Sequence, residues 1–160
     1  MRVTLIRHGE AGDDAPRDEL RSLTMRGRST AARVARSLRR RGGDFTLMAS
    51  SPFVRALQTA EIVAAGVGYG GRLVISEHLV PEGRVSRAVA WLTTLKEEDS
   101  IALVAHEPIL SSLAGALLGV DRFPALRKGE ALRLRLPDGP GHSGEVRWRI
   151  DPETGERESP

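Results

Sequence analysis

Short apolar runs alternate with longer amphipathic segments along the first three quarters of the chain. The apolar runs are rich in Val, Ile, Leu and Ala, and they predict buried strands at Val3–Ile6, Phe45–Ala49, Leu73–Ile75 and Ile101–Ala105. The amphipathic segments predict helices over Met25–Arg40, Pro52–Ala65, Ser86–Leu95 and Pro108–Leu118. This alternation predicts an α/β fold, a three-layer sandwich whose mostly parallel central sheet carries helices on both faces.

Polar and special residues mark the ends of these predicted helices. Thr24 precedes the first helix and Ser51 precedes the second, and both are residue types that cap helix N-termini. Pro52 follows Ser51 at the first helical position, where proline is favoured. Gly42-Gly43 is expected to stop the first helix, and Gly119 the last one.

The pattern changes to strict alternation near the end of the chain. Leucines and arginines alternate through Leu132–Leu136, and apolar residues again take every second position in Val146–Ile150. The turn sequence Pro137–Gly141 separates the two segments. We expect an antiparallel edge hairpin with one solvated face. It completes a single domain over residues 1–150, and the polar tail over 151–160 is expected to be frayed.

Composition narrows the class of protein. A chain of 160 residues suffices for one domain with a substantial core. No apolar stretch approaches the roughly 20 residues of a membrane span, and the N-terminus lacks a secretory signal, so no membrane partner and a cytoplasmic location are expected. The chain has no cysteine, which excludes disulfides, thiolate catalysis and Cys-ligated zinc.

Charge is nearly balanced, with 24 basic and 21 acidic residues and a formal net charge of +3. The arginine-rich segment Arg28–Arg41 leaves open a non-catalytic module that binds phosphate or nucleic acid. Nucleic-acid binding is disfavoured, because aromatic residues make up 4% of the chain and offer few stacking platforms. We expect this segment to present a solvated basic face, with no nucleic acid as partner.

Two of the predicted buried strands end in histidine. His8 follows the first strand and His106 follows the fourth, and in open α/β sheets ligands bind at the carboxyl ends of strands. Arg7 and Arg55 supply guanidinium groups that fork onto phosphate oxygens, Arg55 from one turn into the second helix. Gly9 lets the backbone approach a ligand closely. These residues predict a crevice for phosphoryl chemistry, with an imidazole as nucleophile.

Together these motifs resemble the histidine phosphatase superfamily, which has the phosphoglycerate mutase-like fold. The resemblance covers nearly the whole chain and is carried by Arg7-His8-Gly9, Leu23-Thr24-x-x-Gly27, Ser51-Pro52-x-x-Arg55-x-x-Gln58-Thr59 and His106. Among its members the chain looks most like the small bacterial phosphohistidine phosphatases of the SixA group. The resemblance implies that His8 accepts the phosphoryl group and that Arg7, Arg55 and His106 form the phosphate pocket. It also implies that the reaction needs no metal and no cofactor.

One departure from the superfamily bears on the substrate. Many members carry a glutamate general acid shortly after the third strand, and here Pro81 takes that position. Glu82 follows directly and is a candidate acid. A phosphomonoester needs such an acid, because its leaving group is a poor alkoxide. The imidazole of phosphohistidine has a conjugate acid with a pKa of about 6.5 and departs with little help.

The sequence therefore favours a phosphatase that hydrolyses phosphohistidine on a partner protein through a phospho-His8 intermediate. In the resembling enzymes the partner is a histidine-phosphotransfer domain of a signalling relay. The alternative is a general small-molecule phosphomonoesterase of the same superfamily, for which Glu82 supplies the acid. Glu10 and Glu107 flank the two histidines and are expected either to orient them or to be solvated.

Overall fold

The computed structural model describes residues 1–41 and 43–159. In this part of the chain seven strands form a single sheet in the order β3-β2-β4-β1-β5-β6-β7. The strands are β1 (Arg2–Arg7), β2 (Leu47–Ser50), β3 (Leu73–Ile75), β4 (Ser100–Ala105), β5 (Ala131–Arg135), β6 (Glu145–Ile150) and β7 (Arg157–Glu158). The helices are α1 (Met25–Arg41), α2 (Val54–Val67), α3 (Val85–Thr94) and α4 (Ile109–Leu118), with short 3-10 turns η1 (Asp18–Leu20) and η2 (Glu77–Leu79).

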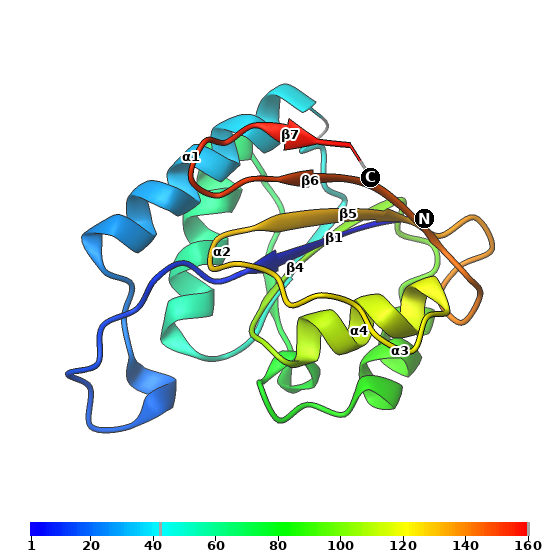
Figure 1. Cartoon of the computed structure of the whole chain (residues 1–160), viewed down its shortest axis with the longest axis horizontal. Coiled ribbons are helices and arrows are strands. Elements are labelled where there is room, and N and C mark those ends of the chain that lie inside the picture. Colours follow the sequence, from blue (N-terminus) through cyan, green and yellow to red (C-terminus); the bar gives the residue numbers. More distant parts are fainter. Residues whose placement is uncertain (42, 160) are drawn as a thin grey trace.

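The expected α/β sandwich is confirmed. β3, β2, β4 and β1 are parallel neighbours, whereas β5, β6 and β7 continue the sheet antiparallel from the other side of β1. Helices α1 and α2 cover one face and α3 and α4 the other (Figure 1). Each face has its own buried apolar cluster against the sheet. The carboxyl ends of β1, β2 and β4 therefore lie together at the same end of the sheet, where ligands bind in open α/β folds.

Most predicted boundaries lie within two residues of those observed. β3 has the predicted bounds, and β2 begins two residues later than predicted, at Leu47. Thr24 caps α1, since its hydroxyl accepts from the backbone N–H of Gly27 at 3.0 Å. Gly119 ends α4 in the left-handed conformation, with φ of 70°. The predicted stop at Gly42-Gly43 includes residue 42, which lies outside the described residues.

The predicted cap of the second helix is wrong. α2 begins at Val54 with Phe53 as its N-cap, so Ser51 and Pro52 precede the helix. The Ser51 hydroxyl accepts from the backbone N–H of Phe53 at 3.3 Å and also contacts His106. A serine before a proline resembles a helix start, but here the serine belongs to the turn that leaves β2.

The antiparallel hairpin lies at the expected side of the sheet, but its polar face is not solvated throughout. β5 pairs with β1, and β7 pairs only with Arg149 and Ile150 of β6. Arg133 is 4% exposed, with its guanidinium 5.5 Å from the ring centroid of Phe45 and 5.2 Å from that of Trp148. The faces of aromatic rings attract cations, and the two rings therefore stabilise the buried Arg133 on the polar face of β5.

The C-terminal tail was wrongly expected to be frayed. Residues 151–159 turn back to place β7 beside β6, while Pro160 lies outside the described residues. The segment is tied to α1, because Arg33 Nη1 donates to the carbonyl of Pro152 at 2.8 Å and Ser37 Oγ to that of Gly155 at 2.7 Å. Within the described part of the chain, no helix is long and apolar enough to cross a membrane.

Candidate active site

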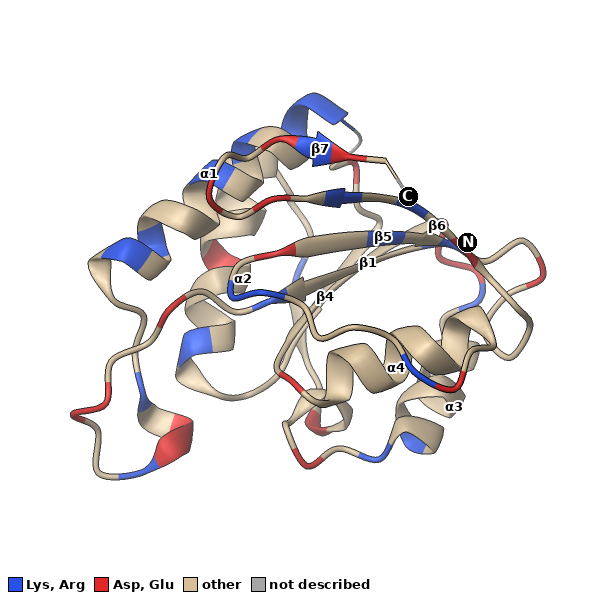
Figure 2. Ribbon diagram, in the orientation of Figure 1, with Lys and Arg blue, Asp and Glu red and all other residues tan. Residues whose placement is uncertain are grey.

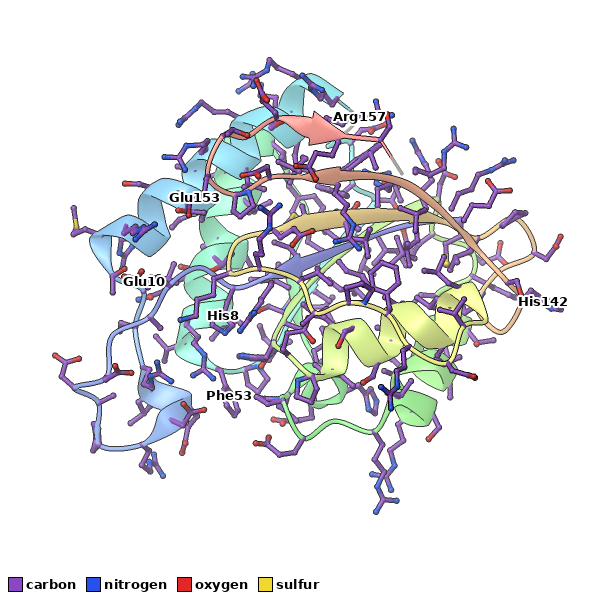
Figure 3. The ribbon with its side chains drawn as sticks, viewed as in Figure 1. His8, Glu10, Phe53, His142, Glu153 and Arg157 are labelled. Carbon is purple, nitrogen blue, oxygen red and sulfur yellow. The ribbon has the colours of Figure 1, made fainter. Side chains whose placement is uncertain are left out.

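The two histidines meet at the carboxyl edge of the parallel strands. His8 follows β1 and His106 follows β4, and because these strands are parallel neighbours the ring centroids lie 4.9 Å apart. Arg55 lies in the first turn of α2, the helix that follows β2, and its Nε is 3.3 Å from His8 Nε2. Phe53 packs edge-on to His106 with ring centroids 5.0 Å apart, on the side of the fold where Figure 3 shows His8.

Hydrogen bonds fix the tautomer of His8. Nδ1 lies 2.6 Å from the carbonyl oxygen of Gly9, which is only an acceptor, so Nδ1 must carry the proton. Nε2 then holds the lone pair, and the Arg55 Nε–H points at it. The structure thus presents one defined imidazole nitrogen as a nucleophile.

Burial keeps both imidazoles neutral. The pKa of His8 is lowered to about 4, chiefly because the ring is buried; the Gly9 hydrogen bond opposes this shift, and the positive charges of Arg55 and Arg7 add to it. The pKa of His106 is lowered to about 3, again chiefly by burial and then by repulsion from His8. A neutral His8 at pH 7 keeps the lone pair that an attack on phosphorus requires.

His106 is arranged as a hydrogen-bond donor. Its Nε2 lies 2.8 Å from Ser51 Oγ, and that hydroxyl already accepts from the N–H of Phe53. When the Ser51 hydroxyl donates to Nε2, both groups are satisfied and the proton of the neutral ring sits on Nδ1. Nδ1 is buried and has no hydrogen-bond partner among the described residues. An unpaired buried N–H is costly unless a ligand completes it.

Asp18 holds Arg55 from the loop after β1. Arg55 Nη1 donates to the backbone carbonyl of Asp18 at 2.7 Å, and Nη2 forms an ion pair with its carboxylate at 3.0 Å. The side chain of Arg55 is 6% exposed, so this contact is largely shielded from water. Hydrogen bonds from Arg21 first, and then from Arg55, lower the pKa of the Asp18 carboxyl, although slight burial opposes them. These two contacts with Asp18 set the direction of the Arg55 Nε–H toward His8.

Arg7 ends β1 beside this group. Its Nη1 donates to the carbonyl of Leu126 at 2.6 Å, and its buried Nε has no hydrogen-bond partner in the described part of the chain. Burial lowers the pKa of Arg7, and the carboxylates of Glu107 and Glu130 oppose this shift. An Nε–H held in place without a partner is suited to an oxyanion.

Gly9 is required by packing within the protein. A Cβ at Gly9 would lie 2.7 Å from the carbonyl oxygen of Gly27, and one at Gly27 only 2.1 Å from that of Glu10. The loop after β1 and the first turn of α1 therefore approach each other closely because both residues lack side chains. The amide of Gly9 also donates to Thr59 Oγ1 at 3.2 Å, which ties the loop to α2.

The structure does not bring the predicted carboxylates to the histidines. Glu82 is exposed in the turn after η2 and makes no hydrogen bond or ion pair within the described residues. Glu10 accepts from Thr24 at the start of α1 at 2.9 Å. Glu107 accepts from the backbone N–H of Leu126 at 2.9 Å, so it orients the loop that Arg7 also holds.

A cavity of about 380 Å³ lies next to this group, beyond Glu10. It is lined by Glu10, Arg26, Thr30, Arg127, Lys128, Pro152 and Glu153. Glu10, which lines this cavity, lies two residues after His8 in the loop that follows β1. In residues 1–41 and 43–159, no group of three or more His, Asp or Glu side chains is arranged to hold a metal ion.

Comparison with known proteins agrees with this geometry. The family model of the histidine phosphatase superfamily (branch 1) matches residues 3–80. A protein of Picosynechococcus is 35% identical over 121 residues, which are 73% of each chain. The chain belongs to the histidine phosphatase superfamily. It is therefore a phosphatase.

Two further similarities cover almost the whole chain. The phosphohistidine phosphatase SixA of Escherichia coli is 27% identical over 154 residues, which are 95% of this chain and 94% of that protein. A structure of the protein histidine phosphatase SixA complexed with tungstate superposes with a TM-score of 0.91, at 26% identity, over 98% of this chain and 100% of that one.

Sequence reasoning missed two residues of this histidine phosphatase site. Asp18 lies in a polar loop 37 residues from Arg55, and nothing in the local sequence marks the contact. Ser51 was expected only as a helix cap, although its hydroxyl in fact reaches His106, 55 residues away. Thr59 is buried in α2, where its hydroxyl donates to the carbonyl of Arg55 and accepts from the amide of Gly9.

The buried neutral histidines predict that acid destabilises the fold. Their folded-state pKa values of about 4 and 3 lie below the ordinary 6.5, so the unfolded chain binds more protons as the pH falls through this range. Stability is therefore expected to fall by several kcal/mol between pH 6.5 and 3. Thermal unfolding measured across this range should show a smaller loss for His106→Asn than for His142→Asn, the exposed control. Equal losses in the two variants would contradict the assignment.

Proposed function

We propose that this protein hydrolyses phosphohistidine on a partner protein through a covalent phospho-His8 intermediate. The observation that carries the proposal is the fixed tautomer of His8. Its proton is held on Nδ1 by Gly9, and its Nε2 lone pair lies beside Arg55 and the His106 ring. A neutral imidazole with one unprotonated nitrogen beside cationic side chains is equipped to take up a phosphoryl group.

The reaction proceeds in two displacements at phosphorus. The Nε2 lone pair of His8 attacks, a P–Nε2 bond forms, and the P–N bond to the substrate imidazole breaks. The electron pair goes to the leaving nitrogen, which takes a proton from solvent. A water molecule then attacks the phosphorus of phospho-His8 and loses a proton to solvent. The P–Nε2 bond breaks, orthophosphate leaves, and the His8 lone pair is restored.

The other side chains of the site stabilise the negative charge of the phosphoryl group during its transfer. Arg7 Nε–H supplies a cationic donor and His106 Nδ1–H a neutral one. The Arg55 Nε–H, which points at His8 Nε2, is released to a phosphoryl oxygen when that lone pair forms the P–N bond. Donors aimed in advance at the phosphoryl oxygens stabilise the transition state without reorganisation. In this scheme protein side chains supply both the nucleophile and the groups that stabilise the phosphoryl charge, and no step calls for a metal ion or a cofactor.

The expected preference for a P–N bond rests on Pro81, which takes the position of the glutamate general acid that many members of the superfamily carry. Pro81 cannot donate a proton, and Glu82 is exposed in the turn after η2, with no hydrogen bond to either histidine. A phosphoester would leave as an unprotonated alkoxide, whereas an imidazole leaves readily. Similarity over nearly the full length to phosphohistidine phosphatase SixA supports the same substrate class. We assign the partner to the histidine-phosphotransfer domains of signalling relays.

The deciding experiment compares two substrates. The protein is incubated with a phosphohistidine-bearing phosphotransfer domain and, separately, with glycerol 2-phosphate, an ester whose leaving group is an alkoxide, and kcat/KM is measured for each from orthophosphate release. We expect kcat/KM for phosphohistidine to be higher by at least about 100-fold, the usual contribution of a general acid that only the ester needs. His8→Asn serves as the control and should lose both activities.

The reverse preference would overturn the proposal. Fast hydrolysis of the ester would make the protein a small-molecule phosphomonoesterase. A loss of that ester activity in Glu82→Gln would then identify Glu82 as its acid.

A further inference from the structure

A pocket of about 280 Å³ lies on the face of the sheet that α1 covers, and we call it the arginine pocket. It is lined by Arg2, Arg41, Arg133, Arg135, Arg147, Arg157 and Trp148. The sequence pattern predicts only a solvated strand face and a helix end for these arginines, and the proposed phosphatase mechanism uses none of them. Six guanidinium groups around one hollow are unusual, because like charges in close proximity repel.

The arginine pocket and the histidine site lie at opposite ends of β1. Arg2 opens this strand and pairs in register with Arg135 on β5, while Arg7 and His8 lie at its other end. Six residues of strand separate the two ends by roughly 17 Å. Figure 3 likewise shows Arg157 on β7 well away from His8 and Phe53. A ligand of this pocket is therefore not a substrate in contact with His8.

Arg133 forms the floor of the pocket. It lies opposite Trp148 in the β5–β6 register, with its guanidinium 5.2 Å from that ring and 5.5 Å from the ring of Phe45. Arg157 reaches the same Trp148 ring at 5.9 Å. Burial and the charge of Arg2 lower the pKa of Arg133 to about 10, which leaves the guanidinium charged at neutral pH. These cation–π contacts hold the guanidinium groups of Arg133 and Arg157 beside the rings before any ligand arrives.

The carboxylates near the pocket do not neutralise it. Asp99 and Asp44 approach Arg2 at 2.6 Å and 3.9 Å, and Glu145 is shared by Arg135 and Arg147 at 3.9 Å and 3.6 Å. All three carboxylates are more than half exposed, so these pairs are screened by water. In residues 1–41 and 43–159, Arg41 and Arg157 have no ion pair.

Charge and size together indicate the class of ligand. Because Arg41 and Arg157 have no ion pair among the described residues, the hollow carries an excess of positive charge. A volume of 280 Å³ lies just below the range of ligand pockets, which starts at about 300 Å³, so the hollow suits a small anion. Figure 2 shows basic segments on β5, β6 and β7 and at the end of α1. These cations converge on one hollow, which distinguishes them from the extended stripe that tracks a nucleic-acid backbone.

We propose that the arginine pocket binds an oligophosphate anion, that is, a chain of two or three linked phosphate groups. Each guanidinium group can donate two hydrogen bonds to a pair of phosphate oxygens. Several such groups around one hollow therefore bind an anion with several phosphates more tightly than one with a single phosphate. Such a chain occurs both as free inorganic oligophosphate and as the phosphate moiety of a nucleotide. The inference stands apart from the proposed phosphatase activity, because no residue of the histidine site contributes to it.

Trp148 makes the pocket directly observable. The chain has two tryptophans, so Trp91→Phe leaves Trp148 as the only indole. In that background, with His8→Asn added to abolish turnover, tripolyphosphate is titrated at constant ionic strength and Trp148 fluorescence is followed. We expect a saturable change, with orthophosphate binding at least about tenfold more weakly because it engages fewer forks. ATP is titrated in parallel: tighter binding than tripolyphosphate identifies a nucleotide ligand, and weaker binding a free oligophosphate.

Matched double variants test the location. Arg147→Ala with Arg157→Ala removes two exposed arginines of the pocket, and we expect tripolyphosphate affinity to fall at least about tenfold. Arg39→Ala with Arg40→Ala removes the same charge from the exposed end of α1, outside the pocket, and should change affinity less than about twofold. Equal losses in both variants, or no saturable signal, would overturn the proposal. So would tighter binding of a DNA oligonucleotide than of tripolyphosphate.

Discussion

Replacing His8 with asparagine is expected to lower the turnover of phosphohistidine by at least about 10⁴-fold, because the nucleophile of a covalent mechanism has no substitute. Asparagine is close in size and keeps polar atoms in the loop after β1. Its amide nitrogen has no lone pair available for attack on phosphorus. The loss should therefore fall on kcat, with the fold retained.

A trapping experiment identifies the intermediate directly. The protein is mixed with a ³²P-labelled phosphohistidine domain, quenched in alkali and separated on a denaturing gel. The unmodified chain should carry transient label that is stable to alkali and lost in acid, as expected of a phosphoramidate. His8→Asn should carry none, and His78→Asn, a partly buried histidine beside Trp91, should behave like the unmodified chain. Label on the His8 variant would mean that a different residue is the nucleophile.

Replacing Arg55 with lysine is expected to lower kcat/KM for phosphohistidine by about 10²- to 10³-fold, the range seen when one transition-state donor is removed. The substitution keeps the positive charge but removes the planar guanidinium group with its several N–H donors. Arg55 contacts His8 through Nε and Asp18 through both terminal nitrogens, with distances of 3.3, 2.7 and 3.0 Å. A single ammonium group cannot make these three contacts in fixed directions.

Arg21→Lys is the matched control for Arg55→Lys. Arg21 pairs with the same Asp18 carboxylate at 3.0 Å, but its hydrogen bonds and ion pairs reach neither histidine. Its substitution should therefore cost less than about tenfold in kcat/KM. If the two lysine variants were equally impaired, Arg55 would act only by holding Asp18. Circular dichroism of both variants confirms that the fold is retained.

The parallel half of the fold was accessible from the sequence for a simple physical reason. Its strands are buried on both faces and appear as short continuous apolar runs, and the chemistry-bearing residues follow those runs directly. The sequence alone therefore places His8 and His106 at one edge, because parallel neighbouring strands end together. Arg55 followed from its place one turn into the helix after β2.

Other parts of the site depend on contacts that no local pattern encodes. Asp18 reaches Arg55 across 37 residues, and its surroundings resemble any polar loop. Ser51 has the sequence context of a helix cap, and only the position of β4 brings His106 within reach of its hydroxyl. Side-chain bonds between distant segments are set by tertiary packing, which local propensity does not determine.

The antiparallel half of the fold shows the same limit. Alternation of leucine and arginine in β5 is typical of a half-exposed strand, yet Arg133 lies between two aromatic rings. The alternation correctly predicted the strand and its two faces. It carried no information about which further elements cover the polar face, and here the covering comes from Phe45 and from Trp148 on β6.

The place of β1 in the sheet also determines when the protein can fold during synthesis. Both partners of this strand come late in the chain: β4 begins at Ser100, and β5 ends at Arg135. The first residue's amino group bonds to the carbonyl of Leu136, 135 positions away. A nascent chain on the ribosome therefore carries its nucleophile on an unpaired apolar strand until most of the polypeptide has emerged, a stage at which chaperones protect such segments. Phosphatase activity should thus arise only after Arg135 has left the ribosome.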